Sequence, residues 1–122
     1  MDPEDELEIL KAKYPDFSSD WPTVFPIMLK VIGAMRLAVA KNELFFEPSH
    51  RVASAWAGAA ADIAAIRGTK GMGDGDILRR SARVMVDKAP NADVRAAIIL
   101  HMDPHVPGGA IADGESNNIT KR

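Results

Sequence analysis

The apolar positions of the chain are densest between Val24 and Val39, where the sequence reads VFPIMLKVIGAMRLAV. On a helical wheel its apolar side chains cover more than half of the circumference. A surface helix normally has a narrower stripe, so we expect this one to contact two or more helices, or another subunit. Thr23 can cap this central helix, which should end near Leu44 or Phe45. Phe45 and Phe46 are then expected to close the core at that end.

The residues before this helix predict a shorter helix followed by two aromatic plugs. Asp2 can cap a helix and Pro3 suits its first position, so the first helix should run to about Lys13 with one modest apolar stripe. The next segment has two prolines and turn-prone Ser and Asp residues, and we expect it to break the helix. Its Phe17 and Trp21 are expected to fold back onto the core, because two large aromatic side chains are worth more buried.

A third helix is predicted from Ser49 or His50 to about Ile66, in an alanine-rich segment. Its expected buried stripe follows the helical period: Val52, Trp56, Ala59, Ile63 and Ile66. Its alanines form a second, nearly flat surface that lets another helix approach closely: Ala53, Ala57, Ala60, Ala61 and Ala64. Two successive helices this poor in charge exceed the needs of a small monomer, so we expect a homo-oligomer or an obligate protein partner.

The segment 67–76 holds four glycines in eight residues and predicts a loop. It matches neither of the glycine patterns GxxxxGK[ST] and GxGxxG that bind phosphate. Asp74 and Asp76 would also repel a phosphate, and the remaining ligands of a calcium loop are missing. We therefore interpret the segment as a flexible connection.

Two more helices and a tail are predicted after this loop. Its aspartates can cap a helix that runs to about Lys88, and Asn91 can cap a last helix, Ala92–Met102. Residues 107–122 show no period and contain glycines, so we expect a disordered tail. No repeat or alternating strand pattern occurs. The predicted fold is all-α, a compact bundle of about five helices in one domain, 1–106, with a flexible tail.

Composition narrows the classes of protein. The chain of 122 residues has no cysteine, which excludes disulfides, thiolate metal sites and a cysteine nucleophile. The first ten residues are acidic and lack the basic and apolar parts of a signal peptide. The central apolar run is shorter than the ~20 residues that span a bilayer, and it contains Lys30 and Arg36. We expect a soluble cytoplasmic protein without a membrane partner.

The charge of the chain is unevenly distributed. Residues 1–20 hold seven acids against two bases, a balance of −5, and residues 67–95 hold seven bases against four acids, a balance of +3. Such an asymmetry can steer a charged partner, or it can let one part of the protein cover another.

Four basic residues of the predicted fourth helix are the candidate macromolecule-binding residues: Arg79, Arg80, Arg83 and Lys88. Arginines can grip phosphates or reach bases, and the last two helices have the order of a helix-turn-helix. In a helix-turn-helix the second helix enters the DNA groove, but here that helix, Ala92–Met102, carries a single arginine and most of the basic residues lie on the helix before it. A solvated face, or salt bridges to the acidic first residues, explains these charges better. Nucleic-acid binding is the alternative hypothesis.

The chemistry-bearing residues predict neither a metal site nor an active site. His101, Asp103 and His105 span a helix end and a proline, at a spacing that fits neither a helical nor a strand-borne zinc motif. No nucleophile stands beside a plausible base, so we expect no enzyme and no cofactor. No motif identifies a family. The predicted function is a small cytoplasmic, non-enzymatic protein-interaction or assembly subunit, such as an adaptor, regulator or inhibitor.

Overall fold

The computed structural model describes residues 2–46, 48–67 and 73–107. In these ranges the protein is all-α and has no strand, which confirms the predicted fold class. The elements are α1 (Pro3–Lys13), α2 (Pro15–Asp20), α3 (Val24–Ala40), α4 (His50–Arg67), α5 (Asp74–Ser81), α6 (Arg83–Val86), α7 (Ala92–Met102) and the 3₁₀ turn η1 (Asp103–His105). The predicted tail lies outside the described residues except for Pro107, and so do residues 68–72 of the predicted glycine loop.

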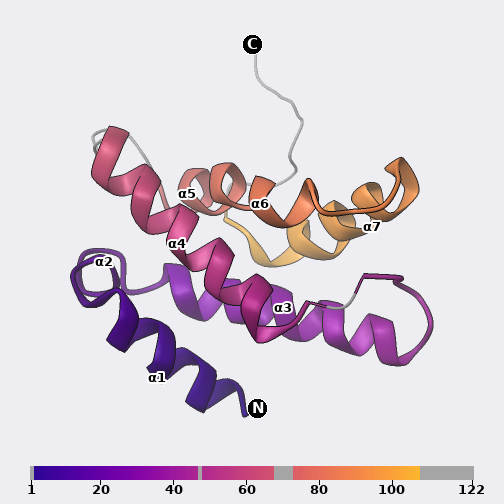
Figure 1. Ribbon diagram of the computed structural model, residues 1–122, viewed down its shortest axis with the longest axis horizontal. Coiled ribbons are helices and arrows are strands. Elements are labelled where there is room, and N and C mark those ends of the chain that lie inside the picture. Colours follow the sequence, from indigo (N-terminus) through magenta and orange to yellow (C-terminus); the bar gives the residue numbers. More distant parts are fainter. Residues whose placement is uncertain (1, 47, 68–72, 108–122) are drawn as a thin grey trace.

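Helix α3 is the hub of the bundle, as predicted. It lies across the middle of the molecule, with α1 and α2 on one side and α5 to α7 on the other (Figure 1). It packs against α1, α4, α5, α7 and η1. Each of these neighbours covers only part of the wide apolar face, which explains why that face exceeds the width of an ordinary surface stripe. Its buried residues are Val24, Phe25, Met28, Val31, Ile32, Met35 and Ala38.

The hub helix ends at Ala40, before the predicted end. Asn42 adopts a left-handed conformation with φ 62°. Its backbone N–H donates to the carbonyl of Val39 at 3.0 Å, and the N–H of Glu43 donates to the carbonyl of Ala38 at 2.8 Å. This pair of bonds is a Schellman motif, in which an asparagine can replace the usual glycine. The motif stops the helix before Leu44.

The early end changes which side chains close the core. Leu44 is buried, with 2% of its surface exposed, whereas Phe45 is 76% exposed. Phe46 is partly buried and packs against the core. The prediction that Phe45 closes the core was wrong, because the chain leaves helical geometry three residues before it.

The segment between α1 and α3 contains a short helix, α2, in addition to the predicted break after α1. Asp2 caps α1 as predicted, accepting a hydrogen bond from the N–H of Glu4 at 3.1 Å. The short helix α2 starts with Pro15 in its first turn, where a missing N–H is not needed. Phe17 is buried at the core, and the half-buried Trp21 packs against it. The predicted aromatic plugs are confirmed, but on a helix where a break without structure was expected.

Helix α4 turns its small side chains to the core more than its large ones. Ala53, Trp56, Ala57 and Ala60 are fully buried. Ile66 was predicted to be buried and is 81% exposed. The helix packs against α1, α3, α5 and α6 at once. Such crowding favours alanine at the contacts, because small residues allow short distances between helix axes.

The predicted fourth helix is two helices, α5 and α6, divided at Ala82. The Ser81 hydroxyl donates to the carbonyl of Ile77, four residues back, at 2.6 Å and accepts the indole N–H of Trp56 at 2.9 Å. A serine that bonds back to the preceding turn tends to bend a helix. The buried serine thus links the break to the core of α4.

The N-terminal caps of α3, α5 and α7 differ in part from the predicted ones. Asn91 caps α7 as predicted, accepting the N–H of Val94 at 2.9 Å. Gly73 is the N-cap of α5, and the Asp76 carboxylate accepts its N–H at 3.1 Å. Thr23 makes no capping bond on α3; its hydroxyl donates to the carboxylate of Asp74 and so joins α3 to α5.

Candidate functional site

Arg79, the first of the predicted binding residues, is used inside the fold. Its guanidinium donates to the carbonyl of Pro107 at 2.8 Å and to the carbonyl of Val106 at 3.4 Å. These bonds tie α5 to the chain that follows η1. Arg79 is therefore half-buried and does not share an open face with the other basic residues of the predicted set.

The other three predicted residues are exposed on or just after α5 and α6. Arg80 and Lys88 are exposed. Arg83 is 79% exposed, with its Nε 4.0 Å from a carboxylate oxygen of Asp87 one turn later. No ion pair joins them to the acidic first residues within the described part of the chain. Arg80, Arg83 and Lys88 are therefore in contact with solvent, which agrees with the interpretation of these charges as a solvated face.

The histidines near the end of α7 do not assemble with other ligands. His101 lies in the last turn of α7, and Asp103 and His105 lie in η1. Within the described ranges, no three side chains of His, Cys, Asp or Glu are grouped so that they could hold a metal ion.

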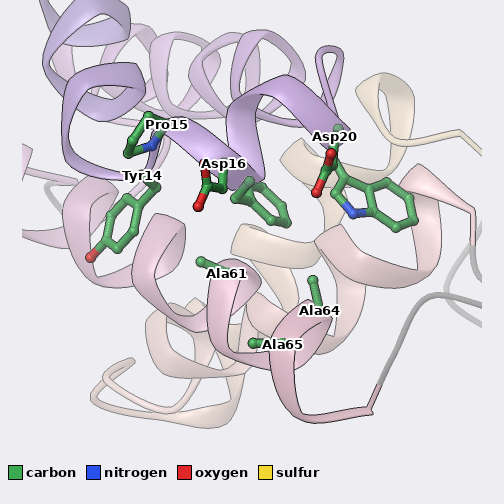
Figure 2. Close-up of a pocket in the computed structure, with 9 residues that line it drawn as sticks. Tyr14, Pro15, Asp16, Asp20, Ala61, Ala64 and Ala65 are labelled. Atoms are coloured by element: carbon green, nitrogen blue, oxygen red, sulfur yellow. The ribbon is translucent and has the colours of Figure 1, made fainter.

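A hollow with polar walls lies between α2 and the second half of α4, and we call it the α2–α4 pocket (Figure 2). Its volume is about 340 Å³. The lining residues are Tyr14, Pro15, Asp16, Phe17, Asp20, Trp21, Ala61, Ala64 and Ala65. Carboxylates and aromatic rings therefore line one side, and three alanines line the other.

The two carboxylates of this pocket are placed by the short helix α2. Asp16 and Asp20 are four residues apart, a spacing that puts both on one face of a helix. In Figure 2 both carboxylates lie on the side of α2 that faces Ala61 and Ala64 of α4. No other described residue forms an ion pair or a hydrogen bond with either of them. Two negative charges thus face one hollow without a counter-charge from the described chain.

The aromatic wall of the pocket is fixed by ring contacts that reach the core. Phe17 stacks on Trp21 with centroids 6.4 Å apart and planes 19° apart, and it lies 5.3 Å from the ring of Phe25. Tyr14 meets Phe25 edge-on at 6.3 Å. Because Phe25 is fully buried in α3, these contacts hold the wall against the hub helix. Tyr14 and Trp21 are only partly buried, so they keep surface for a ligand.

Helix α1, which carries Tyr14 at its end, is anchored by a buried ion cluster. The Glu6 carboxylate is 1% exposed and accepts two bonds from the Arg36 guanidinium, at 2.9 and 3.1 Å. The Nδ1 of His50 lies 3.0 Å from the same carboxylate. Arg36 also donates from Nε to the carbonyl of Pro48 at 2.8 Å. The cluster joins α1 to α3 and to the beginning of α4.

The pKa of Glu6 reflects this setting. Burial alone would raise the pKa of the carboxyl, but the hydrogen bonds and positive charges of Arg36 and His50 outweigh burial and hold it below its ordinary value. Sequence reasoning missed this role, because Glu6 sits in an acidic first turn that looks solvated. The available signal was its spacing from Leu10, which places both residues on one helix face.

The exposed large apolar side chains are spread along the sequence. They come from five separate segments: Ile9, Leu37, Phe45, Ile66 and Leu100. Single exposed apolar residues are normal in soluble domains, so the predicted homo-oligomer stays a prediction. None of the described helices has both the length and the apolar character needed to cross a membrane.

Comparisons of the chain with models of protein families, with curated proteins and with solved structures found no match in any of the three. The α2–α4 pocket is therefore interpreted from its own chemistry.

Proposed function

We propose that the protein is a non-enzymatic interaction module, and that its α2–α4 pocket receives a lysine or arginine side chain of a protein partner. The observation that carries the proposal is the pair of carboxylates, Asp16 and Asp20, that face an aromatic-walled hollow without a counter-charge from the described chain. A cation entering there gains electrostatic attraction from both.

The aromatic wall adds a preference for organic cations. A lysine or arginine head group within about 6 Å of a tryptophan or tyrosine ring gains about 0.5–2 kcal/mol from the ring quadrupole. Trp21 and Tyr14 offer partly exposed rings at the two ends of α2. A hydrated metal ion gains less from such walls than a side chain with an apolar stem, which also covers the rings.

The size of the hollow and its floor fit a single side chain. A volume of about 340 Å³ lies at the lower end of ordinary ligand pockets. Ala61, Ala64 and Ala65 end at Cβ, so α4 leaves room where larger side chains would fill the space. A long basic side chain can lie along this floor with its charge between the carboxylates.

Charge distribution supports a basic partner segment. Residues 1–20 carry a balance of −5, which raises the local concentration of positively charged chains. The segment can belong to another protein or to a second copy of this chain, whose residues 67–95 carry a balance of +3. Sedimentation analysis of the protein alone separates these sources, since only the second produces dimers.

The pocket is tested by titrating N-acetyl-argininamide and N-acetyl-lysinamide into isotope-labelled protein. We expect saturable shifts of backbone amides around 14–21 and 61–65. Asp16→Asn with Asp20→Asn should weaken binding by about tenfold, the equivalent of 1.4 kcal/mol. The matched control is Asp5→Asn with Glu8→Gln, which removes the same charge from exposed positions outside the pocket.

A second variant tests the shape of the pocket without changing charge. Ala65→Leu places a larger side chain on an exposed wall residue and should also weaken binding, because the side chain fills part of the pocket. Equal weakening by the control variant would mean that only general electrostatic attraction is at work, and the proposed pocket would then be rejected.

The alternative, nucleic-acid binding, keeps only the exposed residues Arg80, Arg83 and Lys88 of the predicted set. No described feature adds a second element to that face, so it stays the second choice.

A further inference from the structure

A second, larger hollow lies along α4, between the end of α1 and α6, and we call it the α4 groove. Its volume is about 630 Å³. Tyr14 lines both this groove and the α2–α4 pocket. Val84 of α6 forms the opposite wall. The groove shares no carboxylate with the pocket, and its charges have the opposite sign at one end.

The positive end of the groove combines α1 and the first turns of α4. Lys13 donates from Nζ to the hydroxyl of Ser54 at 2.8 Å, which holds the lysine over α4. Its Nζ also lies 5.8 Å from the centre of the Tyr14 ring. Arg51 is exposed at the same end of α4. Two cationic head groups and a hydroxyl thus line one end of a preformed hollow.

His50 adds a directed hydrogen-bonding group to this end. Its Nδ1 is engaged by the buried carboxylate of Glu6 at 3.0 Å, which fixes the orientation of the ring. The second ring nitrogen, Nε2, is on the other side of the imidazole and has no hydrogen-bond partner among the described residues. The side chain is 35% exposed and lines the groove. A carboxylate behind a histidine is a usual way to orient an imidazole toward a ligand.

The floor of the groove is kept low by small residues, chiefly Gly58 with Ala55 and Ala59. A Cβ at position 58 would lie 2.8 Å from the hydroxyl of Tyr14. Glycine inside a helix is less favourable than alanine, and here the missing side chain leaves room for the Tyr14 hydroxyl against α4.

The far end of the groove is acidic. Asp62 lines it, two turns of helix beyond Ser54, at roughly 12 Å for a rise of 1.5 Å per residue. A ligand that spans the groove would therefore place an anion at one end and a hydrogen-bond donor at the other.

We propose that the α4 groove binds a phosphate monoester, with the phosphate between Lys13, His50 and Arg51 and a hydroxyl or amino group of the ligand near Asp62. Charged hydrogen bonds from Lys13 and Arg51 to phosphate oxygens are stronger than bonds between neutral groups. The volume, about 630 Å³, lies within the range of small-molecule sites. The phosphate can belong to a free metabolite or to a phosphoserine of a peptide, which share this chemistry.

The first test titrates inorganic phosphate into labelled full-length protein at constant ionic strength. A site with a Kd of about 1 mM, or 4.1 kcal/mol, is nearly saturated at about 20 mM. We expect saturable shifts at residues 13–14 and 50–62, and no such shifts with chloride. Ribose 5-phosphate and a phosphoserine peptide are then compared, and the tighter of the two identifies the source of the phosphate.

Matched variants decide whether the groove is responsible. Lys13→Gln with Arg51→Gln should weaken phosphate binding by at least about tenfold, or 1.4 kcal/mol. Arg80→Gln with Arg95→Gln removes the same charge from exposed positions outside the groove and should leave binding unchanged. Thermal unfolding of each variant checks that the fold is intact.

A lack of saturable shifts, or equal weakening by both pairs of variants, would overturn the proposal. The result is independent of the proposed cation pocket, because Asp16 and Asp20 are unchanged and the probes have opposite charge.

Discussion

The α2–α4 pocket and the α4 groove share Tyr14 and use α4 as their floor, yet the charged walls of the pocket are acidic, whereas the groove is basic at one end and acidic at the other. In the pocket the ionisable groups come from α2 alone, as Asp16 and Asp20. In the groove the basic groups come from the end of α1 and the beginning of α4. Small residues of α4 thus provide the space in both hollows, while the charged groups at the edges of each hollow select its ligand.

Both hollows depend on the placement of α1. Tyr14 and Lys13 stand at its end, and the cluster around Glu6 anchors the same helix to α3 and α4. Changes in the hub or in the anchor should therefore affect both sites. Changes at the shared tyrosine should alter the balance between them, and changes elsewhere should leave both intact.

The largest effect is expected from Met35→Asp in the hub helix. Met35 is fully buried, and a carboxylate there would have no partner. The cost should exceed about 5 kcal/mol, which is comparable with the whole stability of a domain of this size. Circular dichroism and amide dispersion should show loss of the fold and of both sites together. Lys30→Glu, on the exposed side of the same helix, should fold normally. A folded Met35→Asp protein would place the core elsewhere.

The next effect is expected from Glu6→Gln, which neutralises the anchor of α1. Removing one partner of a buried ion pair typically costs about 3 kcal/mol, because the other charge stays partly buried. Arg36 is 30% exposed, so water recovers part of that cost. Chemical unfolding should show the loss, and both the cation and the phosphate titrations should weaken. Glu8→Gln is the control on the same helix, where the side chain is 73% exposed. Equal stabilities of the two variants would show that the anchor is dispensable.

The Glu6→Gln variant also tests how the free energy of unfolding depends on pH. The pKa of Glu6 is lower in the folded protein than in the unfolded chain, so its contribution is present above the ordinary value of 4.5 and is lost as pH falls through the folded pKa. The difference in unfolding free energy between the wild type and Glu6→Gln should therefore shrink on acidification below about pH 4.5. A difference that stays constant down to pH 2, about two units lower, would contradict a lowered pKa.

The central position of α3 was predictable from the pattern of apolar residues in the sequence. The wide apolar face of α3 needs several neighbours, and it has them. The end of α3 was predicted too late, near Leu44 or Phe45, because the pattern of apolar residues does not show that Asn42 is the left-handed residue of a Schellman motif. On α4 the sequence predicted a buried stripe that ends at Ile66 and a second, alanine surface for close helix packing; Trp56 of the stripe is buried as expected, and so are Ala53, Ala57 and Ala60 of the alanine surface. There, close approach of four helices places alanines inward and leaves Ile66 exposed.

The sites were less predictable, because they combine residues far apart in sequence. Pro15 is a signal in the sequence for the start of α2. Once a helix begins there, Asp16 and Asp20 lie on one of its faces. Nothing local shows that α4 lies opposite these carboxylates. Arg79 illustrates the converse error, since a charged residue on a polar helix face bonds to carbonyls of the chain after η1.

A smaller effect is expected from alanine at Gly33 and Gly58, two of the glycines that lie inside helices. Gly33 of α3 has open space around its would-be Cβ, so Gly33→Ala should stabilise the protein by about 0.5–1 kcal/mol. Gly58→Ala should lack this gain, because the new methyl group meets the hydroxyl of Tyr14 at 2.8 Å. It should also displace the ring from the boundary between the sites and change both titrations.

The cause of that difference can be isolated by adding Tyr14→Phe. The ring carbon that bears the hydroxyl lies 3.6 Å from the would-be Cβ, an ordinary contact, so Gly58→Ala should become favourable once the hydroxyl is removed. A double-mutant cycle in chemical unfolding measures the coupling, which we expect to be about 1 kcal/mol. Zero coupling would show that Tyr14 does not rest on Gly58 in solution.

The smallest effect is expected from Arg80→Gln with Arg83→Gln. Arg83 is 79% exposed and 4.0 Å from Asp87, so its ion pair is weak, and Arg80 is exposed. Exposed pairs contribute about 0–1 kcal/mol, and the unfolding free energy should change by less than about 0.5 kcal/mol. Neither the cation nor the phosphate titration should change, because neither residue lines either of these two hollows.

A titration with duplex DNA at several salt concentrations uses the same variant. Salt-dependent binding that the variant loses would move function from the two hollows to this arginine face, because the variant leaves the fold and both hollows as they are.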